Sequence, residues 1–287
     1  MTIEGPPTIP SSDEAKREHE ISRLRLQART GFNGRSAEYL TKQFGNPDNP
    51  NIHFESLLDL GVGGGDMLPV LAPYLTSSGI IIGFDIDPSR LSAARQVIET
   101  LNLNKKVTLL QGDVARIILP DESIQAVYAR LFWHHLPENQ RHQALSEVYR
   151  VLEKGGRVIF EDADKLFDEW RTFPPSEAHE KIKEAGRAFY QKKGKETLMG
   201  SKFPLFLESV RLRVEDVNSY VIETTGDNPF KRAHIAIATT FLAGARELDI
   251  LSQKEADRLL TQFQEDLLKP ETTIWVSPIV QITAAKE

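Results

Sequence analysis

Two kinds of hydrophobic pattern follow one another along this chain, and the change between them falls near residue 55. From there on, short runs of mostly apolar residues alternate with longer stretches in which apolar positions recur every three or four residues. A short apolar run is typical of a strand buried on both faces, and the longer pattern is typical of a helix with one buried side. The pattern predicts strands at residues 56–60, 79–84, 106–110, 124–129 and 157–161, and helices at 88–101 and 138–152. This alternation predicts a doubly wound α/β domain, in which helices cover both faces of a parallel sheet.

Local residues indicate where two of these helices begin and end. Asp87 is placed to cap the first helix, and Pro88 takes its first helical position, where a missing N–H leaves no bond unmade. Gly155 and Gly156 follow the second helix, and we interpret them as its C-terminal stop.

Helical patterns dominate outside this core. Ser11 and Glu14 form a capping box at the start of a helix expected over 13–30. The other expected elements are helices at 35–44, near 177–193 and near 204–210, a strand near 212–223, a helical segment at 230–268 and a last strand at 274–284. The chain therefore divides into an N-terminal tail with helices (1–50), an α/β core (51–163), a helical cap insertion (164–203) and the C-terminal part of the sheet (204–287), which carries the insertion at 230–268. The N-terminal helices are expected to form a lid or a contact with a second subunit.

The composition excludes several classes of function. The chain has 287 residues, no cysteine and a net charge of −6. Without cysteine there is no disulfide framework, no thiolate metal site and no cysteine nucleophile. A nucleic-acid surface is normally basic, so a nucleic-acid partner is not expected. The sequence contains no run of 18 apolar residues and no apolar signal segment, so we expect a cytoplasmic protein without a membrane partner.

A glycine cluster follows the first strand of the core. Glycine lets the backbone turn tightly against a ligand, and the next helix presents free N–H groups there. A dinucleotide-binding loop has the form G-x-G-x-x-G, but counting from Gly61 the sixth position is Asp66. Asp59 adds a second acid at the strand end. Two carboxylates suit a ligand with positive charge, so S-adenosylmethionine, which carries a sulfonium and an ammonium and no phosphate, is favoured over NAD.

Two further acids end the next two strands. Asp85 lies 20 residues beyond Gly65, where a carboxylate can accept both ribose hydroxyls. Asp113 follows the third strand and can accept from the adenine amine. Because parallel strands bring their carboxyl ends to one edge, which is where such sheets bind ligands, the three acids are expected to lie together.

The segment from about 55 to 162 resembles the core of class I S-adenosylmethionine-dependent methyltransferases. The matching motifs are LLDLGVGGGD (57–66), GFDIDPSRL (83–91), QGDV (111–114), YARLFWHHL (128–136) and LEKGGRVIFED (152–162). The resemblance implies a Rossmann-like, mostly parallel sheet of seven strands whose last strand is antiparallel. One departure is Arg211, which stands where the family usually has a glycine before the sixth strand.

The same resemblance implies roles for individual residues. Gly61 and Gly63 would surround the methionine part of the cofactor, and Arg130 would lie beside its tail. The ribose and adenine contacts would come from Asp85 and Ile86 and from the Gly112, Asp113 and Val114 segment. No metal is required.

Residues after the fourth and fifth strands can provide a general base. Methyl transfer from a sulfonium is an in-line displacement, so positioning can supply most of the catalysis and a base is needed only if the acceptor loses a proton. His134, Glu161 and Asp162 are the base candidates. A packing role for each of them, and for the neighbouring His135, remains the alternative.

A small-molecule acceptor fits the sequence best. The Asn/Asp-Pro-Pro-Tyr motif of enzymes that methylate nucleic-acid amino groups is missing after strand four, where Ala129, Arg130, Leu131 and Phe132 stand. Aromatic residues of the insertion suggest a lining for an apolar or aromatic metabolite, although they can equally anchor the insertion; they are Phe167, Trp170, Phe173, Phe189, Tyr190, Phe203 and Phe206.

The expected activity is therefore transfer of a methyl group to an O, N or C atom of a small metabolite, with S-adenosyl-L-homocysteine as product. The alternatives are a methyltransferase acting on a protein or RNA, and a non-methylating S-adenosylmethionine-binding protein of the same fold. We expect a monomer or a homodimer.

Overall fold

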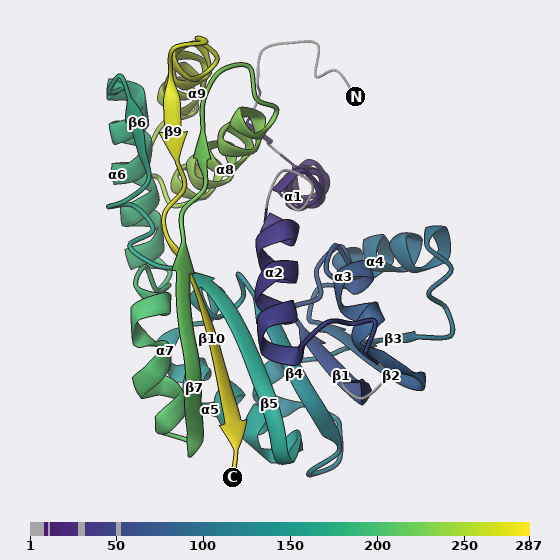
Figure 1. Cartoon of the computed structure of the whole chain (residues 1–287). Coiled ribbons are helices and arrows are strands. Elements are labelled where there is room, and N and C mark those ends of the chain that lie inside the picture. The colour runs from purple at the N-terminus through teal and green to yellow at the C-terminus, as the bar shows by residue number, and fades with distance from the viewer. Residues whose placement is uncertain (1–8, 11, 28–31, 50–52) are drawn as a thin grey trace. The chain divides into compact units, whose positions relative to one another are not determined.

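The chain divides into two compact units in a computed structural model, which describes residues 9–10, 12–27, 32–49 and 53–287. The first unit, here the sheet unit, takes in the described residues of 31–164, 198–220 and 279–287. The second, here the helical unit, takes in those of 1–30, 165–197 and 221–278. Figure 1 shows the elements of both units.

The sheet unit contains a seven-stranded sheet in the order β3-β2-β1-β4-β5-β10-β7. Its strands are β1 (Phe54–Leu60), β2 (Leu75–Asp85), β3 (Val107–Gln111), β4 (Ile124–Arg130), β5 (Leu152–Ala163), β7 (Leu212–Tyr220) and β10 (Ile279–Lys286). Neighbouring strands are parallel, except that β10 runs antiparallel to both β5 and β7. The predicted fold class, a doubly wound and mostly parallel sheet with an antiparallel last strand, is confirmed.

Helices cover both faces of this sheet. They are α2 (Asn33–Phe44), α3 (Leu68–Leu71), α4 (Pro88–Thr100), α5 (Glu138–Val151) and α7 (Met199–Glu208), with short 3₁₀ turns η3 (Ala72–Tyr74), η4 (Val114–Arg116) and η5 (Trp133–His135). Successive side chains of a strand point to opposite faces. Leu57 accordingly joins the apolar cluster that contains Leu40 of α2, and Leu58 joins the cluster that contains Leu145 of α5.

The predicted helix ends are partly correct. Asp87 caps α4 by accepting a hydrogen bond from the Ser89 N–H at 2.8 Å, as predicted. The interpretation of Gly155 and Gly156 as a helix stop was wrong, because α5 ends at Val151 and these glycines lie inside β5. Gly155 has a φ of +77°, in a stretch where the pairing of β5 with β4 changes register.

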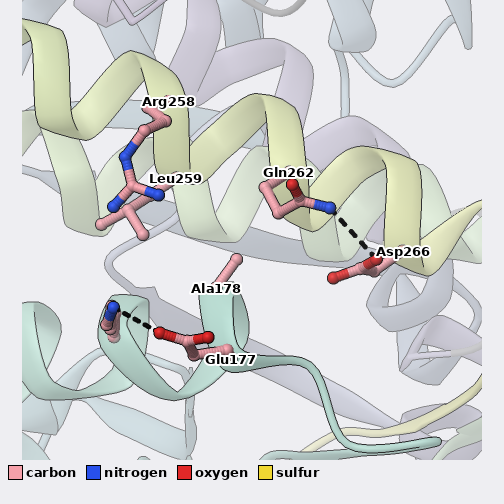
Figure 2. A pocket seen from close by; sticks show the side chains of 7 residues that line it. Glu177, Ala178, Arg258, Leu259, Gln262 and Asp266 are labelled. Atoms are coloured by element: carbon pink, nitrogen blue, oxygen red, sulfur yellow. Dashed lines mark hydrogen bonds and ion pairs between the residues drawn. The ribbon is translucent and has the colours of Figure 1, made fainter.

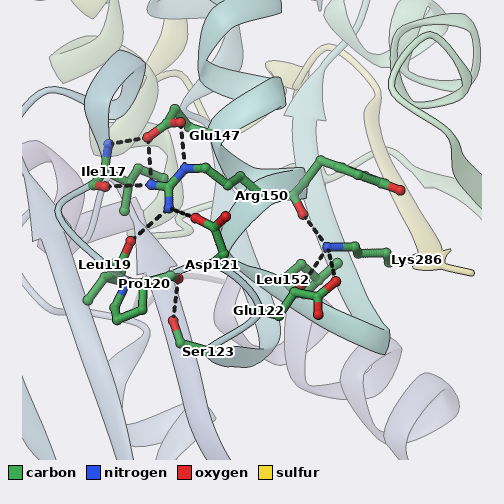
Figure 3. Close-up of polar contacts among 11 residues, drawn as sticks. Ile117, Leu119, Pro120, Asp121, Glu122, Ser123, Glu147, Arg150, Leu152 and Lys286 are labelled. Atoms are coloured by element: carbon green, nitrogen blue, oxygen red, sulfur yellow. Dashed lines mark hydrogen bonds and ion pairs between the residues drawn. The ribbon is translucent and has the colours of Figure 1, made fainter.

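Arg150 of α5 stabilises the loop that leads into β4 through hydrogen bonds and ion pairs (Figure 3). Its guanidinium donates to the carbonyl oxygens of Ile117 (2.8 Å) and Leu119 (2.9 Å) and to the carboxylates of Asp121 (2.6 Å) and Glu147 (2.8 Å). One planar group thus satisfies two backbone carbonyls that lie outside any regular element.

The helical unit consists of four helices and a small antiparallel sheet. The helices are α1 (Asp13–Gln27), α6 (Glu177–Lys192), α8 (Phe230–Glu247) and α9 (Gln253–Leu267), and the sheet has the order β6-β9-β8, with β6 (Arg171–Phe173), β8 (Glu223–Thr224) and β9 (Thr273–Trp275). The segment predicted as helical over 230–268 is two helices, and Ser252 with Glu255 forms the capping box that starts the second. Ser11, predicted to cap the first helix, lies outside the described residues.

Two boundaries predicted around the insertions were wrong. The helix expected near 204–210 begins at Met199 and belongs to the sheet unit, although 199–203 was assigned to the insertion. The last strand, predicted over 274–284, is interrupted after Trp275, so β9 belongs to the small sheet and β10 alone joins the large one.

The aromatic residues expected to form one lining lie in two separate units. Phe167, Trp170, Phe189 and Tyr190 belong to the core of the helical unit, and Phe203 with Phe206 packs in the sheet unit. Phe173 is 64% exposed. The prediction of one aromatic lining was wrong, since six of the seven side chains pack into the cores of two units.

A surface hollow of about 290 Å³ lies between α6 and α9 of the helical unit (Figure 2). Two polar contacts line the hollow: Lys181 pairs with Glu177 at 2.5 Å, and the Gln262 amide donates to the Asp266 carboxylate at 3.3 Å. Among the described residues, no helix is both long enough and apolar enough to cross a membrane.

Candidate active site

The glycine cluster forms a tight loop at the carboxyl end of β1. Gly61, Gly63 and Gly65 all have positive φ values, of +68°, +53° and +81°. The N–H groups of Gly61 and Val62 both donate to the carbonyl of Phe84 in β2, at 2.8 and 3.1 Å. A Cβ on Gly61 would lie 2.4 Å from the ring of Phe132. Gly61 is therefore required both by its backbone conformation and by the ring that packs on it.

Asp85 is held rigidly at the end of β2. Its side chain is buried, its Oδ2 accepts from the Gly63 N–H at 3.0 Å, and its Oδ1 accepts from the Asp87 N–H at 3.0 Å. Each carboxylate oxygen can accept a further hydrogen bond. The carboxylate is thus oriented by the glycine loop and by the start of α4, while keeping acceptor capacity for two hydroxyl groups.

The next positions differ in what they can offer a ligand. Ile86 is 65% exposed, so it presents an apolar surface directly after Asp85. Gly112 leaves room for Phe84, whose ring would lie 2.6 Å from an added Cβ. Asp113 is exposed and its side chain accepts from the Ala115 N–H at 2.9 Å, which makes it the cap of η4. Val114 is a core residue, so its backbone alone can face a ligand.

Asp59 is a buried acid at the carboxyl edge of the sheet, and its pKa is strongly shifted. It is 3% exposed, and its Oδ2 has no hydrogen-bond partner among the described residues. Burial raises the pKa of Asp59, Arg130 lowers it and the nearby carboxylate of Asp85 raises it, and the net result is a pKa of about 7. A buried carboxyl with an unsatisfied oxygen is costly to maintain. These residues fit a ligand that brings a cation or a hydrogen-bond donor, and they do not fit a diphosphate.

Arg130, at the end of β4, is held by the N-terminal turn of α2. Its Nη1 donates to Asn33 Oδ1 at 2.8 Å and to Ser36 Oγ at 3.3 Å. Asn33 in turn donates from Nδ2 to the carbonyl of Asp66, at 2.9 Å, in the loop after β1. Asn33 and Ser36 were not predicted as site residues. They stand about 95 positions before Arg130, and no local motif marks them.

His134 and Asp162 form a buried pair between η5 and β5. Asp162 Oδ2 accepts from the His134 backbone N–H at 3.1 Å, and Asp162 Oδ1 contacts His134 Nδ1. Asp162 Oδ1 also accepts from the Ala163 N–H at 2.8 Å. A carboxylate bound to Nδ1 fixes the tautomer and the orientation of an imidazole. The ring of His135 packs on that of His134, with centroids 3.8 Å apart.

Glu161 is fully buried and makes three side-chain hydrogen bonds. Oε1 accepts from Tyr128 OH at 2.5 Å, and Oε2 accepts from Ser36 Oγ at 3.0 Å and Gln281 Nε2 at 2.9 Å. Strand pairing aligns a polar row across β4, β5, β10 and β7, formed by Arg130, Glu161, Gln281 and Asn218. This row lies on the face of the sheet that α2 covers.

Comparisons with known proteins agree with this geometry. Residues 58–160 match the family model of the methyltransferase domain. A demethylmenaquinone methyltransferase of Lactobacillus johnsonii is 36% identical over 101 residues, which are 35% of this chain and 41% of that relative. The match therefore spans less than half of the relative's length.

Two solved structures show the same fold over most of the chain. A Bacillus halodurans protein assigned as a methyltransferase has a TM-score of 0.58 and 19% identity, with 87% of this chain and 98% of that chain covered. The 4+2 cyclase SpnF has a TM-score of 0.58 and 13% identity, with 98% of both chains covered.

The predicted family and its cofactor, S-adenosylmethionine, are thereby confirmed for this part of the chain. Residues 58–160 match a methyltransferase domain, and the sheet unit around them has the fold of the class I S-adenosylmethionine-dependent methyltransferases.

Proposed function

We propose that this protein transfers the methyl group of S-adenosylmethionine to a small metabolite and releases S-adenosyl-L-homocysteine. The observation that carries the proposal is the acidic cradle at the ends of β1 and β2. There the Gly63 N–H orients the carboxylate of Asp85, and Asp59 has a buried oxygen that finds no hydrogen-bond partner in the described part of the chain. Such a cradle complements a cationic ligand with a ribose diol and repels a phosphorylated one.

The proposed cofactor contacts follow the order of the strands. Asp85 accepts from the ribose hydroxyls, and Ile86 packs against the adenine, whose edge meets the segment from Gly112 through Asp113 to Val114. At the methionine end, the ligands are proposed to be Asp59, Gly61, Gly63 and Arg130, with Asp66 on the rim of the loop.

S-adenosylmethionine, when bound, supplies an electrophilic methyl group on a sulfonium. We assign His134 as the general base that removes a proton from the acceptor, and Asp162 as the residue that orients its ring. Alignment of two bound reactants supplies on the order of 7–11 kcal/mol, and a base adds about 10²–10⁴-fold to the rate. Glu161 is assigned to positioning, because its three hydrogen bonds hold Ser36, Tyr128 and Gln281.

A small acceptor with a polar group is favoured over a wholly apolar one. The predicted aromatic lining is not formed, and the face of the sheet beside Glu161 carries the polar row instead. The buried hydroxyl of Tyr220, at the end of β7, has no partner among the described residues. Burial chiefly raises the pKa of Tyr220, and the charge of Glu161 raises it as well.

A non-methylating enzyme of the same fold is the second candidate function. The observation in its favour is the similarity to SpnF, a 4+2 cyclase, over 98% of both chains. The arrangement of His134 and Asp162 favours methyl transfer, because a held base serves an acceptor that must lose a proton.

The test begins with calorimetric titration of S-adenosylmethionine, S-adenosylhomocysteine and NAD. Micromolar binding of both adenosyl ligands without NAD binding is expected, and NAD binding would refute the proposed cofactor. Radiolabelled methyl transfer to a panel of small quinols, phenols and amines then tests the activity. With any acceptor found, His134→Gln should slow turnover about 10²-fold or more without changing cofactor affinity. The matched variant His135→Gln should retain most of the rate.

A further inference from the structure

Asn33 of α2 joins two parts of the candidate site that are far apart in the sequence. Its side-chain amide donates to the Asp66 carbonyl at the end of the glycine loop, and its oxygen accepts from Arg130 at the end of β4. One side chain therefore uses its donor and its acceptor to connect the loop after β1 with a cation whose charge acts on Asp59.

The helix that carries Asn33 is anchored along its whole length. Ser36 donates to the buried Glu161, Tyr39 OH bonds with Thr283 at 3.1 Å, and Thr41 bonds with Tyr74 OH at 3.0 Å. Asn33 lies in the first turn of α2, where it contacts the Asp66 carbonyl, and Thr41 lies two turns further on. The contacts of Tyr39 and Thr41 can hold the helix in place when the Asn33 contacts are removed. The packing of α2 on the sheet unit can therefore be separated from the effect of Asn33 on the candidate site.

We propose that Asn33 is a positioning residue, which fixes Arg130 and the end of the glycine loop in the arrangement that binds the cofactor. The inference rests on the proposed function, because it concerns the same cofactor site. Asn33 acts through Arg130 and the Asp66 carbonyl rather than by touching a reacting atom.

The physical reason lies in the geometry of Arg130. Its Nη1 bond to Asn33, at 2.8 Å, is shorter than its bond to Ser36, at 3.3 Å. A hydrogen bond from a charged donor is stronger and more directional than one between neutral groups. Without Asn33 the guanidinium keeps only the longer of these contacts, and the carbonyl of Asp66 loses its side-chain donor. Cofactor binding must then order both groups, which lowers affinity.

The experiment is calorimetric titration of S-adenosylhomocysteine into four forms of the full chain: wild type, Asn33→Ala, Arg130→Ala and the double variant. We expect Asn33→Ala to raise the Kd about tenfold. In the Arg130→Ala background the same substitution should have a much smaller effect, since residues that act as a unit are not additive. The control Thr41→Val removes the Tyr74 bond on the same helix and should lower the melting temperature while leaving the Kd within twofold.

A second measurement distinguishes a positioning role of Asn33 from a merely structural one. Because coupling between two sites is reciprocal, S-adenosylhomocysteine should slow amide hydrogen exchange in α2 of the wild type and do so much less in Asn33→Ala. A Kd for Asn33→Ala within twofold of the wild type overturns the inference, and so do fully additive effects with Arg130→Ala. Absence of binding by the wild-type chain is a different result, which refutes the proposed function as well.

Discussion

We expect the buried carboxyl of Asp59 to make cofactor binding dependent on pH. Its pKa is raised from an ordinary value of 3.8 to about 7, chiefly by burial. The proposed ligand brings a positive charge to a site where Asp59 is partly protonated, so binding must expel that proton. At pH 6 only about one molecule in eleven has an ionised Asp59, and at pH 8 about ten in eleven do. The affinity for S-adenosylhomocysteine should therefore rise about tenfold from pH 6 to pH 8.

The assay is calorimetric titration at pH 6, 7 and 8 in buffers of different ionisation enthalpy, which also counts the protons released. Near pH 6, binding should release close to one proton per cofactor. In the isosteric variant Asp59→Asn both the proton release and most of the pH dependence should disappear. A wild-type Kd that changes less than twofold over this range would refute the reasoning. An equal pH dependence in Asp59→Asn would assign the titration to another group.

The carboxyl of Asp59 should affect stability in the opposite direction: as pH rises, the affinity for the cofactor increases but the folded state becomes less stable. Its folded pKa lies above its unfolded one, so the unfolded state loses its proton first, and the folded state is destabilised progressively as pH rises from about 4 to 7. A pKa shift of this size lowers the free energy of unfolding above pH 7 by at most roughly 4 kcal/mol. Asp59→Asn is therefore expected to unfold at higher urea concentration than the wild type at pH 8. At pH 4 the difference should be small.

Three further predictions concern other parts of the chain. Asp85→Ala should weaken S-adenosylhomocysteine binding by about 1–3 kcal/mol in calorimetry, and unchanged affinity would place the ribose elsewhere. Burial lowers the pKa values of His179 and His234 to about 3, so the unfolded state takes up protons first and the helical unit should lose stability as pH falls from about 6.5 towards 3; tryptophan fluorescence measures this loss, and His179→Phe should reduce it. Arg150→Lys should cost about 1–2 kcal/mol in urea unfolding, because two backbone carbonyls lose a donor, whereas the exposed control Arg187→Lys should change stability by less than about 0.5 kcal/mol.

Arg211 illustrates how a departure from a family pattern appears in the structure. The residue before β7 has a φ of +66°, the left-handed region that favours glycine. The turn therefore keeps the backbone conformation for which the family usually has glycine, and an arginine adopts it. The sequence shows only that arginine replaces the usual glycine, and the backbone angle shows that Arg211 adopts the left-handed conformation at the cost of local strain.

Most of the candidate site at the carboxyl edge of the sheet was predictable from local patterns. Short apolar runs identified β1, β2 and β3, and in a parallel sheet the residues after each run meet at one edge, so Asp59, Asp85 and Asp113 could be placed together without coordinates. The role of Glu161 was not predictable in this way. Its three partners come from α2, β4 and β10, and their combined hydrogen bonds depend on strand order and helix docking.

The packing of the aromatic residues of the insertion was likewise not predictable from the sequence. Their apolar character predicts burial, but composition does not say in which core a side chain is buried, and four of them pack in the helical unit while two pack in the sheet unit. The preference for an aromatic acceptor therefore lost its basis once the packing was known.

By itself, the sequence determined the α/β rhythm, the glycine loop and the acids at the strand ends, because backbone conformation and strand-end position depend on a few neighbouring residues. Tertiary structure alone decided that α2 brings Asn33 and Ser36 to the candidate site, that Asp162 bonds to His134, and that one Asp59 oxygen has no hydrogen-bond partner among the residues the structure describes. These features depend on which faces pack together and on how much water each group loses, and both are properties of the folded chain as a whole.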